Sequence, residues 1–115
     1  MSQAEQDRRI DYIEFGTTDL PASKAFFERA FGWKFTDWGE GYSSFEDGRL
    51  GGGFRSDQPA GSSPTVILYA TDLDATRERV RAAGAEIFHE HTFPGGRRFH
   101  FRDPGGNELA VWSEK

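Results

Sequence analysis

The chain has 115 residues and no cysteine, so we expect one domain and exclude disulfides, thiolate nucleophiles and cysteine-ligated metal centres. A formal net charge of −5 argues against a nucleic-acid partner, because binding to phosphates requires an excess of Lys and Arg. No run approaches the roughly 20 apolar residues of a membrane span, and the first nine residues are polar. Composition therefore predicts a cytoplasmic protein with no membrane partner.

The chain contains an internal repeat. Residues 18–20, Thr-Asp-Leu, return as residues 71–73, and Ala22 and Ala75 keep the same spacing. Repetition at a fixed spacing is typical of a duplicated supersecondary unit. We therefore expect two units of the same fold, which together account for nearly the whole chain.

The predicted elements follow the same order in both units. Asp19 and Asp72 are predicted helix N-caps, because a short carboxylate accepts from the exposed N–H groups of a first turn. Gly32 and Gly84 fit the left-handed position that ends a helix. The strands are short runs rich in β-branched and aromatic residues, separated by turn sequences. The first unit has strands over 10–15, 34–38, 42–46 and 50–54 around a helix over 20–31; the second has strands over 65–69, 86–91, 98–102 and 108–112 around a helix over 73–83.

These elements predict an α+β fold made of two βαβββ modules. Residues 1–9 form an N-terminal tail, residues 10–54 the first module, residues 55–63 a polar linker, and residues 64–115 the second module. We expect the two modules to make one domain together.

The doubled βαβββ unit, the Thr-Asp-Leu helix starts and the closing sequence Asp-Pro-Gly-Gly-Asn over 103–107 resemble the vicinal oxygen chelate superfamily. This superfamily includes glyoxalase I, the bleomycin-resistance proteins and the extradiol dioxygenases. The resemblance covers residues 10–113. It implies a concave mixed sheet around a cleft, and a homodimer.

The resemblance also implies four metal-ligand positions, usually His or Glu, on the first and last strands of each unit. Here these positions fall on Tyr12, Gly52, Thr65 and Ala110. Divalent ions need several nitrogen or oxygen ligands converging on one point, and none of these four residues supplies a strong one. We therefore expect no cofactor and no metal at these positions. A divalent metal bound elsewhere in the chain is the alternative.

Alternation along the first strand places Tyr12 and Glu14 on one face and the apolar Ile13 and Phe15 on the other. The apolar face is expected to pack on a helix, which leaves Tyr12 and Glu14 toward the cleft. Glu14 is a candidate base or a counter-charge for a cationic ligand. The alternative is a carboxylate paired with arginine, with Arg98 and Arg102 as the available partners.

Aromatic residues supply the remaining candidates for ligand binding. Tyr69 and Trp112 are predicted to stack on a planar or cationic ligand, and Phe54 is a further residue predicted to line the ligand cleft. The alternative is ordinary packing in a core or at a dimer interface. Trp33, Trp38 and Phe45 are further candidates.

One hypothesis for the three histidines is a shared metal site. His89 and His91 share a strand face, and His100 lies on the next predicted strand, but surface or core positions explain them as well. His100 is the best single acid–base candidate, because the ordinary pKa of histidine lies near working pH.

The sequence thus predicts a glyoxalase-like or bleomycin-resistance-like protein that binds an aromatic or cationic small molecule without the usual metal. The alternative is a metal-dependent lyase or isomerase whose ligands have moved to residues such as Glu14, His100 and Glu108.

Overall fold

The computed structural model describes residues 3–57 and 64–114. Its backbone separates into two compact units, which we describe one at a time. The N-terminal module spans Tyr12–Thr65, and the C-terminal module combines Met1–Asp11 with Val66–Lys115.

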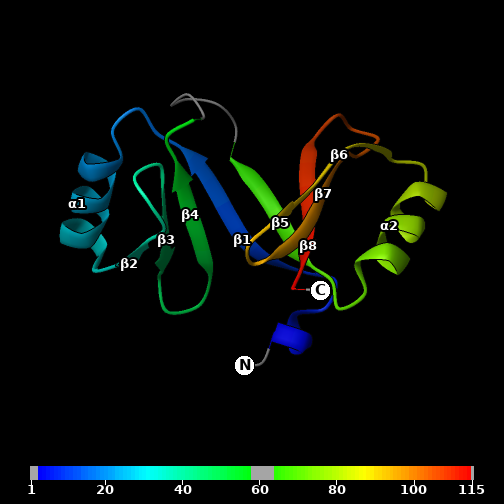
Figure 1. Cartoon of the computed structure of the whole chain (residues 1–115), viewed down its shortest axis with the longest axis horizontal. Coiled ribbons are helices and arrows are strands. Elements are labelled where there is room, and N and C mark those ends of the chain that lie inside the picture. Colours follow the sequence, from blue (N-terminus) through cyan, green and yellow to red (C-terminus); the bar gives the residue numbers. More distant parts are fainter. Residues whose placement is uncertain (1–2, 58–63, 115) are drawn as a thin grey trace. The chain divides into compact units, whose positions relative to one another are not determined.

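The N-terminal module is a four-stranded mixed sheet with one helix on one of its faces (Figure 1). Strands β1 and β4 are parallel, and β3 pairs with β4 and β2 with β3 in the antiparallel sense, giving the order β2-β3-β4-β1. The elements are β1 (Arg9–Gly16, which begins in the other unit), α1 (Leu20–Phe31), β2 (Lys34–Asp37), β3 (Tyr42–Glu46) and β4 (Gly51–Arg55).

The core of this module lies between α1 and the sheet. Buried Leu20, Phe45 and Phe54 form its centre, and Phe15 and Phe27 pack against them among other partly buried rings. Phe54 lies 5.2 Å from Phe15 between ring centroids and 5.5 Å from Phe27. Rings of this size bury enough surface for a small module to hold its sheet against a single helix.

The C-terminal module repeats this topology. Its strand order is β5-β8-β7-β6, with β5 and β8 parallel and the other pairs antiparallel. A short 3-10 helix, η1 (Gln3–Gln6), precedes an isolated bridge from Asp7 to Tyr69. The elements are β5 (Thr65–Tyr69), α2 (Leu73–Ala82), β6 (Glu86–Phe93), β7 (Gly96–Arg102) and β8 (Glu108–Ser113).

The core of the C-terminal module lies on the α2 side of its sheet. Ala70, Leu73, Phe99 and Val111 are buried there, with Val80 and other apolar side chains packed around them. Phe99 pairs with Val111, and the adjacent residues His100 and Ala110 pair with each other. Because side chains alternate along a strand, His100 and Ala110 lie on the opposite face of the sheet. We call this the helix-free face of the module, and use the same term for the N-terminal module.

The helix ends confirm the predicted capping. The Asp19 carboxylate accepts from Ala22 N at 3.1 Å, and the Asp72 carboxylate accepts from Ala75 N at 3.0 Å. Gly32 ends α1 in the left-handed conformation. The second helix ends one residue earlier than predicted, since Ala83 is its right-handed C-cap and Gly84, with φ of +104°, follows. Most of the predicted linker, 58–63, lies outside the described residues.

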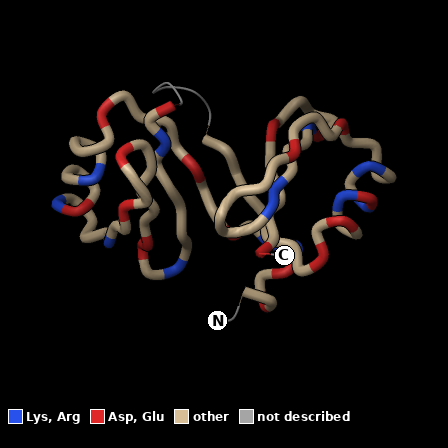
Figure 2. The backbone as a smooth tube through the Cα atoms, viewed as in Figure 1, with Lys and Arg blue, Asp and Glu red and all other residues tan. Residues whose placement is uncertain are grey.

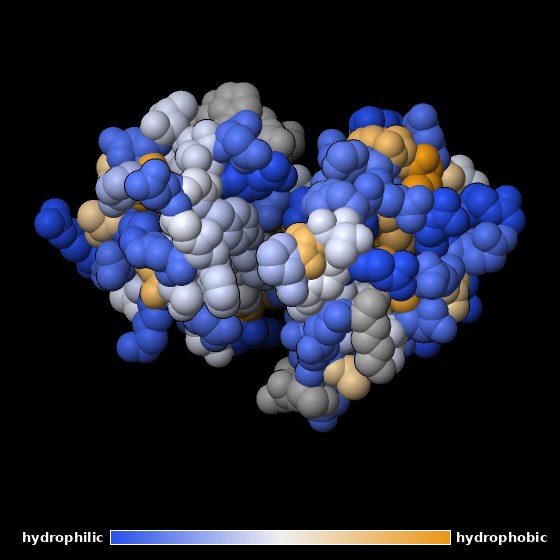
Figure 3. All heavy atoms as spheres, viewed as in Figure 1, coloured by the Kyte–Doolittle hydropathy of each residue, from blue (hydrophilic) through white to orange (hydrophobic). Residues whose placement is uncertain are grey.

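Charged and polar side chains dominate the surface of each module in the views drawn. Acidic and basic residues alternate along α2 (Figure 2), and apolar residues form separate spots among hydrophilic ones (Figure 3). Within the described residues, neither α1 nor α2 has the length and apolar content needed to cross a membrane.

Candidate functional site

A chain of hydrogen bonds lies on the helix-free face of the N-terminal module. The Tyr42 hydroxyl donates to Glu14 Oε2 at 2.9 Å, and its oxygen lies 2.5 Å from the Tyr12 hydroxyl. Since Tyr42 gives its hydrogen to Glu14, Tyr12 is the donor of the shorter bond. Burial, followed by the negative charge of Glu14, raises the pKa of Tyr42 well above its ordinary value. The Tyr42 phenol therefore stays protonated over the whole physiological range.

Glu14 is buried and charge-paired. Its side chain is 4 % exposed, and Arg55 Nη1 donates to Glu14 Oε1 at 3.2 Å. Arg55 also binds Asp57 with two hydrogen bonds, at 2.8 and 2.9 Å. The sequence-based alternative of a carboxylate paired with arginine therefore describes this residue, but the partner is Arg55 rather than Arg98 or Arg102. A carboxylate already neutralised in this way is a poor counter-charge for a cationic ligand.

The glycine run of β4 makes room for the two tyrosines. Gly53 faces Glu14 in the β1–β4 register, and a Cβ there would lie 2.1 Å from Tyr42 Oη and 2.6 Å from Tyr12 Oη. No side chain fits in that space. At Gly51 the nearest atom to an added Cβ is 3.6 Å away, an ordinary contact. Gly53 is thus required by the tyrosine pair, whereas Gly51 is not.

Phe54, predicted among the ligand-binding residues, lies instead in the helix-facing core and is 4 % exposed. The reason is strand alternation: Gly53 and Arg55 face Glu14 and Tyr42, so Phe54 points the other way. Phe45 is in the same core, with its ring stacked 4.4 Å from that of Trp33. Of the further aromatic candidates, only Trp38 is exposed, and its indole N–H donates to Ser44 Oγ.

His100 lies on the helix-free face of the C-terminal module between two charged partners. Its Nδ1 atom is 2.9 Å from Glu108 Oε2, and Arg98 Nε donates to its Nε2 at 3.0 Å. Nε2 therefore carries no hydrogen, and Nδ1–H donates to Glu108. Burial is the main cause of a lowered pKa for His100, which the hydrogen bond to Glu108 partly opposes. The sequence could not identify either partner.

All three histidines of the chain gather on this face. A register shift between Ile87 and His89 aligns His89 with His100 across β6 and β7. The ring centroids of His89 and His91 are 4.9 Å apart, and those of His89 and His100 are 5.3 Å apart. His91 and His100 are 6.2 Å apart. We call these three residues the histidine cluster; His89 and His91 are exposed and His100 is buried.

Tyr69 and Trp112 are edge-to-face neighbours with a centroid separation of 5.1 Å. The Tyr69 hydroxyl donates to Glu114, and the Trp112 indole N–H donates to Asp11 at 2.9 Å. Both rings are therefore held in fixed orientations. From Trp112 the rings continue across the sheet with separations of 6.4, 6.1, 6.2 and 6.0 Å, through Phe93, His91, His100 and Phe88. We call this set, with Tyr69 and Trp112, the aromatic row.

The four positions that the resemblance assigns to metal ligands have other environments. Tyr12 is bonded to Tyr42, Gly52 lies beneath the Phe45 ring, and Ala110 is completely buried. Thr65 begins β5. Among residues 3–57 and 64–114, no three His, Asp or Glu side chains are already arranged as a metal site.

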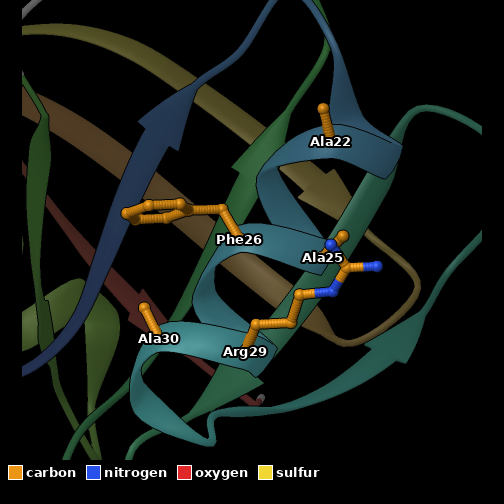
Figure 4. Close-up of a pocket in the computed structure, with 5 residues that line it drawn as sticks. All are labelled: Ala22, Ala25, Phe26, Arg29 and Ala30. Carbon is orange, nitrogen blue, oxygen red and sulfur yellow. The ribbon is translucent and has the colours of Figure 1, made fainter.

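The surface of α1 carries a shallow hollow of about 510 Å³ that contains none of the predicted site residues (Figure 4). The Phe26 ring and the Arg29 side chain extend from the helix in different directions, with three alanines between and beside them. Phe26 is 57 % exposed. The hollow contains no buried polar group that would orient a ligand.

Comparison with known proteins identifies the family. Residues 9–111 match the model of the Glyoxalase/Bleomycin resistance protein/Dioxygenase superfamily, so the chain belongs to it and the resemblance seen in the sequence is confirmed. The chain is 32 % identical over 124 residues to the anthracycline biosynthesis protein DnrV of Streptomyces peucetius. The match covers 88 % of this chain and 45 % of DnrV, so the chain spans about half the length of that relative.

Solved structures show the same fold. The Mn(II)-bound glyoxalase from Novosphingobium aromaticivorans matches with a TM-score of 0.68 and 23 % identity, over 95 % of this chain and 40 % of that one. Methylmalonyl-CoA epimerase from Mycobacterium tuberculosis matches with a TM-score of 0.68 and 14 % identity, over 90 % and 86 %. These likenesses support the α+β, two-module fold.

Proposed function

We propose that this member of the Glyoxalase/Bleomycin resistance protein/Dioxygenase superfamily binds a planar aromatic small molecule on the aromatic row, without a metal at the family's ligand positions. The proposal rests on the exposed ring surface of the aromatic row. Trp112 and Phe93 are only half-buried and His91 beside Phe93 is exposed, so ring surface is available along this part of the row, whereas Tyr69 and His100 are buried. Planar ligands stack on such a surface with little loss of side-chain freedom.

The donor chemistry of the four family positions supports binding without metal there. Glycine and alanine at Gly52 and Ala110 carry no donor atom in their side chains. The Tyr12 hydroxyl is a donor to Tyr42, and burial keeps the latter phenol protonated. A neutral phenol is a weak ligand for divalent ions, which prefer carboxylate or imidazole.

Of the two ligand types that the sequence suggested, the aromatic one is the better supported. Glu14, the expected counter-charge for a cation, is already paired with Arg55. The name of DnrV connects that protein with anthracycline biosynthesis, and anthracyclines are polycyclic aromatic compounds. An aromatic polycycle is therefore our proposed ligand class. The homodimer expected from the sequence stays part of the proposal.

Calorimetric titration tests this function with two probes in the presence of chelator. The first is 1,8-dihydroxyanthraquinone, which is planar and uncharged, and the second is daunorubicin, whose ring system carries a cationic amino sugar. We expect both to bind. Phe93→Ala should weaken binding roughly 2- to 10-fold, since one ring pair contributes about 0.5–1.5 kcal/mol. Trp38→Ala removes an exposed tryptophan from the other module and is the matched control.

Binding that Phe93→Ala and Trp112→Ala both leave unchanged would contradict the assignment to the aromatic row. Thermal melts of each variant show whether the fold persists, and Phe93→Ala serves if Trp112→Ala fails to fold. Binding of daunorubicin alone would favour a cationic ligand over an aromatic one.

A metal-dependent lyase or isomerase with relocated ligands is the second candidate. The His100–Glu108 contact favours it, because two of the three suggested ligands are neighbours. Glu14 is already bonded to Tyr42 and Arg55 in the other module. Chelator-sensitive turnover of a glutathione hemithioacetal would support this candidate, and its absence with metal-loaded protein would remove it.

A further inference from the structure

We propose that the histidine cluster, His89, His91 and His100, is a binding site for one divalent d-block cation of the Zn²⁺, Ni²⁺ or Cu²⁺ type. These residues lie on β6 and β7, strands that carry none of the family's four ligand positions, although His100 faces one of those positions, Ala110, across β7 and β8. The inference uses two residues of the aromatic row, His91 and His100, but does not require that an aromatic ligand binds there.

The distances between the three imidazole rings support a shared metal ion. A Zn–N bond of about 2.0–2.1 Å, extended by roughly 1.1 Å from nitrogen to ring centre, places tetrahedral imidazole ligands with their centroids about 5 Å apart. The centroid separations in the cluster are 4.9, 5.3 and 6.2 Å. Two of the three separations match this value and the third exceeds it. The three side chains as they lie among the described residues do not form a metal site, so His89 and His91 must turn for an ion to bind.

The strand geometry supports the same site. His89 and His91 are two residues apart on one strand, and His89 faces His100 on the antiparallel neighbour. The shift in register before His89 produces this alignment. Because His89 and His91 are exposed, turning their rings toward His100 disturbs no packed core.

The hydrogen bond from His100 to Glu108 also supports a metal site. Imidazole ligands of metals usually donate their second ring N–H to a carboxylate, which fixes the ring and leaves the other nitrogen for the metal. His100 already donates from Nδ1 to Glu108 at 2.9 Å, so Nε2 is the nitrogen left to ligate a metal. Imidazole ligands favour Zn²⁺, Cu²⁺ and Ni²⁺ over Mg²⁺ or Ca²⁺.

Before any metal binds, Arg98 occupies the nitrogen of His100 that the metal would need. Its Nε donates to His100 Nε2 at 3.0 Å, so a cation must displace a positively charged group from that nitrogen. This gives the proposal a distinctive signature. Removing the charge with Arg98→Gln should tighten metal binding, whereas most substitutions near a site weaken it.

The experiment is a calorimetric titration of untagged, chelator-stripped protein with Zn²⁺, followed by Co²⁺ absorption spectroscopy. We expect one ion per chain and the visible bands of low-coordinate Co²⁺. His89→Ala and His91→Ala change exposed residues and should each weaken binding at least about tenfold, as should Glu108→Gln, which acts as a positioning residue. Glu108→Gln should keep the Co²⁺ bands. Thr92→Ala, an exposed neighbour on β6, is the matched control.

Absence of saturable Zn²⁺ uptake would overturn the proposal. So would binding that His89→Ala and His91→Ala leave unchanged, or that Arg98→Gln weakens. Because His91 belongs to both sites, the two proposals are separated by their probes: the aromatic probes are titrated with chelator, and Phe93→Ala, which removes no proposed metal ligand, tests the aromatic ligand alone.

Discussion

Tyr42 donates its phenolic hydrogen to Glu14 at 2.9 Å while its oxygen accepts from Tyr12 at 2.5 Å. One residue of β3 thus satisfies a buried carboxylate and a second tyrosine on β1. Glu14 receives a further hydrogen bond from Arg55 on β4. The helix-free face of the N-terminal module is therefore held by hydrogen bonds that join three neighbouring strands.

Replacing Tyr42 with phenylalanine should remove the centre of this network. We expect Tyr42→Phe to lower the free energy of unfolding by about 1–3 kcal/mol, because both Glu14 and Tyr12 lose a buried partner. Urea denaturation measures the loss. Tyr69→Phe, which removes a hydroxyl bonded to the exposed Glu114, is a control expected to cost less.

The same residue predicts a dependence of stability on alkaline pH. The pKa of Tyr42 is raised in the folded chain above its ordinary value of 10.0, so the unfolded chain releases this proton first. The contribution is fully present below pH 10.0 and is lost as pH rises through the higher folded pKa. Wild type should therefore lose stability above pH 10.0 more steeply than Tyr42→Phe. Equal slopes in urea titrations between pH 9 and pH 11 would show that Tyr42 is not buried as described.

The glycine run offers a matched pair of substitutions on one strand face. Gly53→Ala places a Cβ 2.1 Å from Tyr42 Oη, and we expect a loss of about 1–3 kcal/mol from overpacking. At Gly51 the nearest atom to an added Cβ is 3.6 Å away, so Gly51→Ala should change stability by less than about 1 kcal/mol. Thermal melts of both variants decide the matter. Similar losses in both would contradict the close approach of the two tyrosines to Gly53.

Arg55 is predicted to stabilise the fold mainly by pairing with the Glu14 carboxylate. Arg55→Met leaves a buried carboxylate without its cation, and we expect a loss of about 1–3 kcal/mol. Adding Glu14→Gln in the same chain should restore part of this loss, because the unpaired charge is then gone. A double-mutant cycle measures the coupling. Strict additivity of the two substitutions would show that the pair contributes nothing.

The sequence predicted the elements of the fold well because their signals are local. Asp19 and Asp72 cap helices through atoms three residues away, and the repeat of these caps defines both modules. The alternation of Tyr12, Ile13, Glu14 and Phe15 likewise assigned the two faces of β1 correctly, since only one face of that strand is strongly apolar.

The site was less predictable because it depends on register. Phe54 was misplaced because three preceding glycines give no pattern from which its face can be inferred. The pairing of Glu14 with Arg55 joins residues 41 positions apart through the parallel β1–β4 ladder. The histidine cluster depends on a one-residue irregularity before His89, which no local sequence signal indicates.

The central claim is that a planar aromatic ligand binds the aromatic row of the C-terminal module without metal. The most direct measurement is a ¹H–¹³C correlation spectrum of aromatic side chains, recorded with chelator during titration with 1,8-dihydroxyanthraquinone. Our account predicts progressive shifts of Trp112, Phe93 and His91, with Trp38 unchanged. Shifts confined to other rings, or shifts that require added metal, would contradict it.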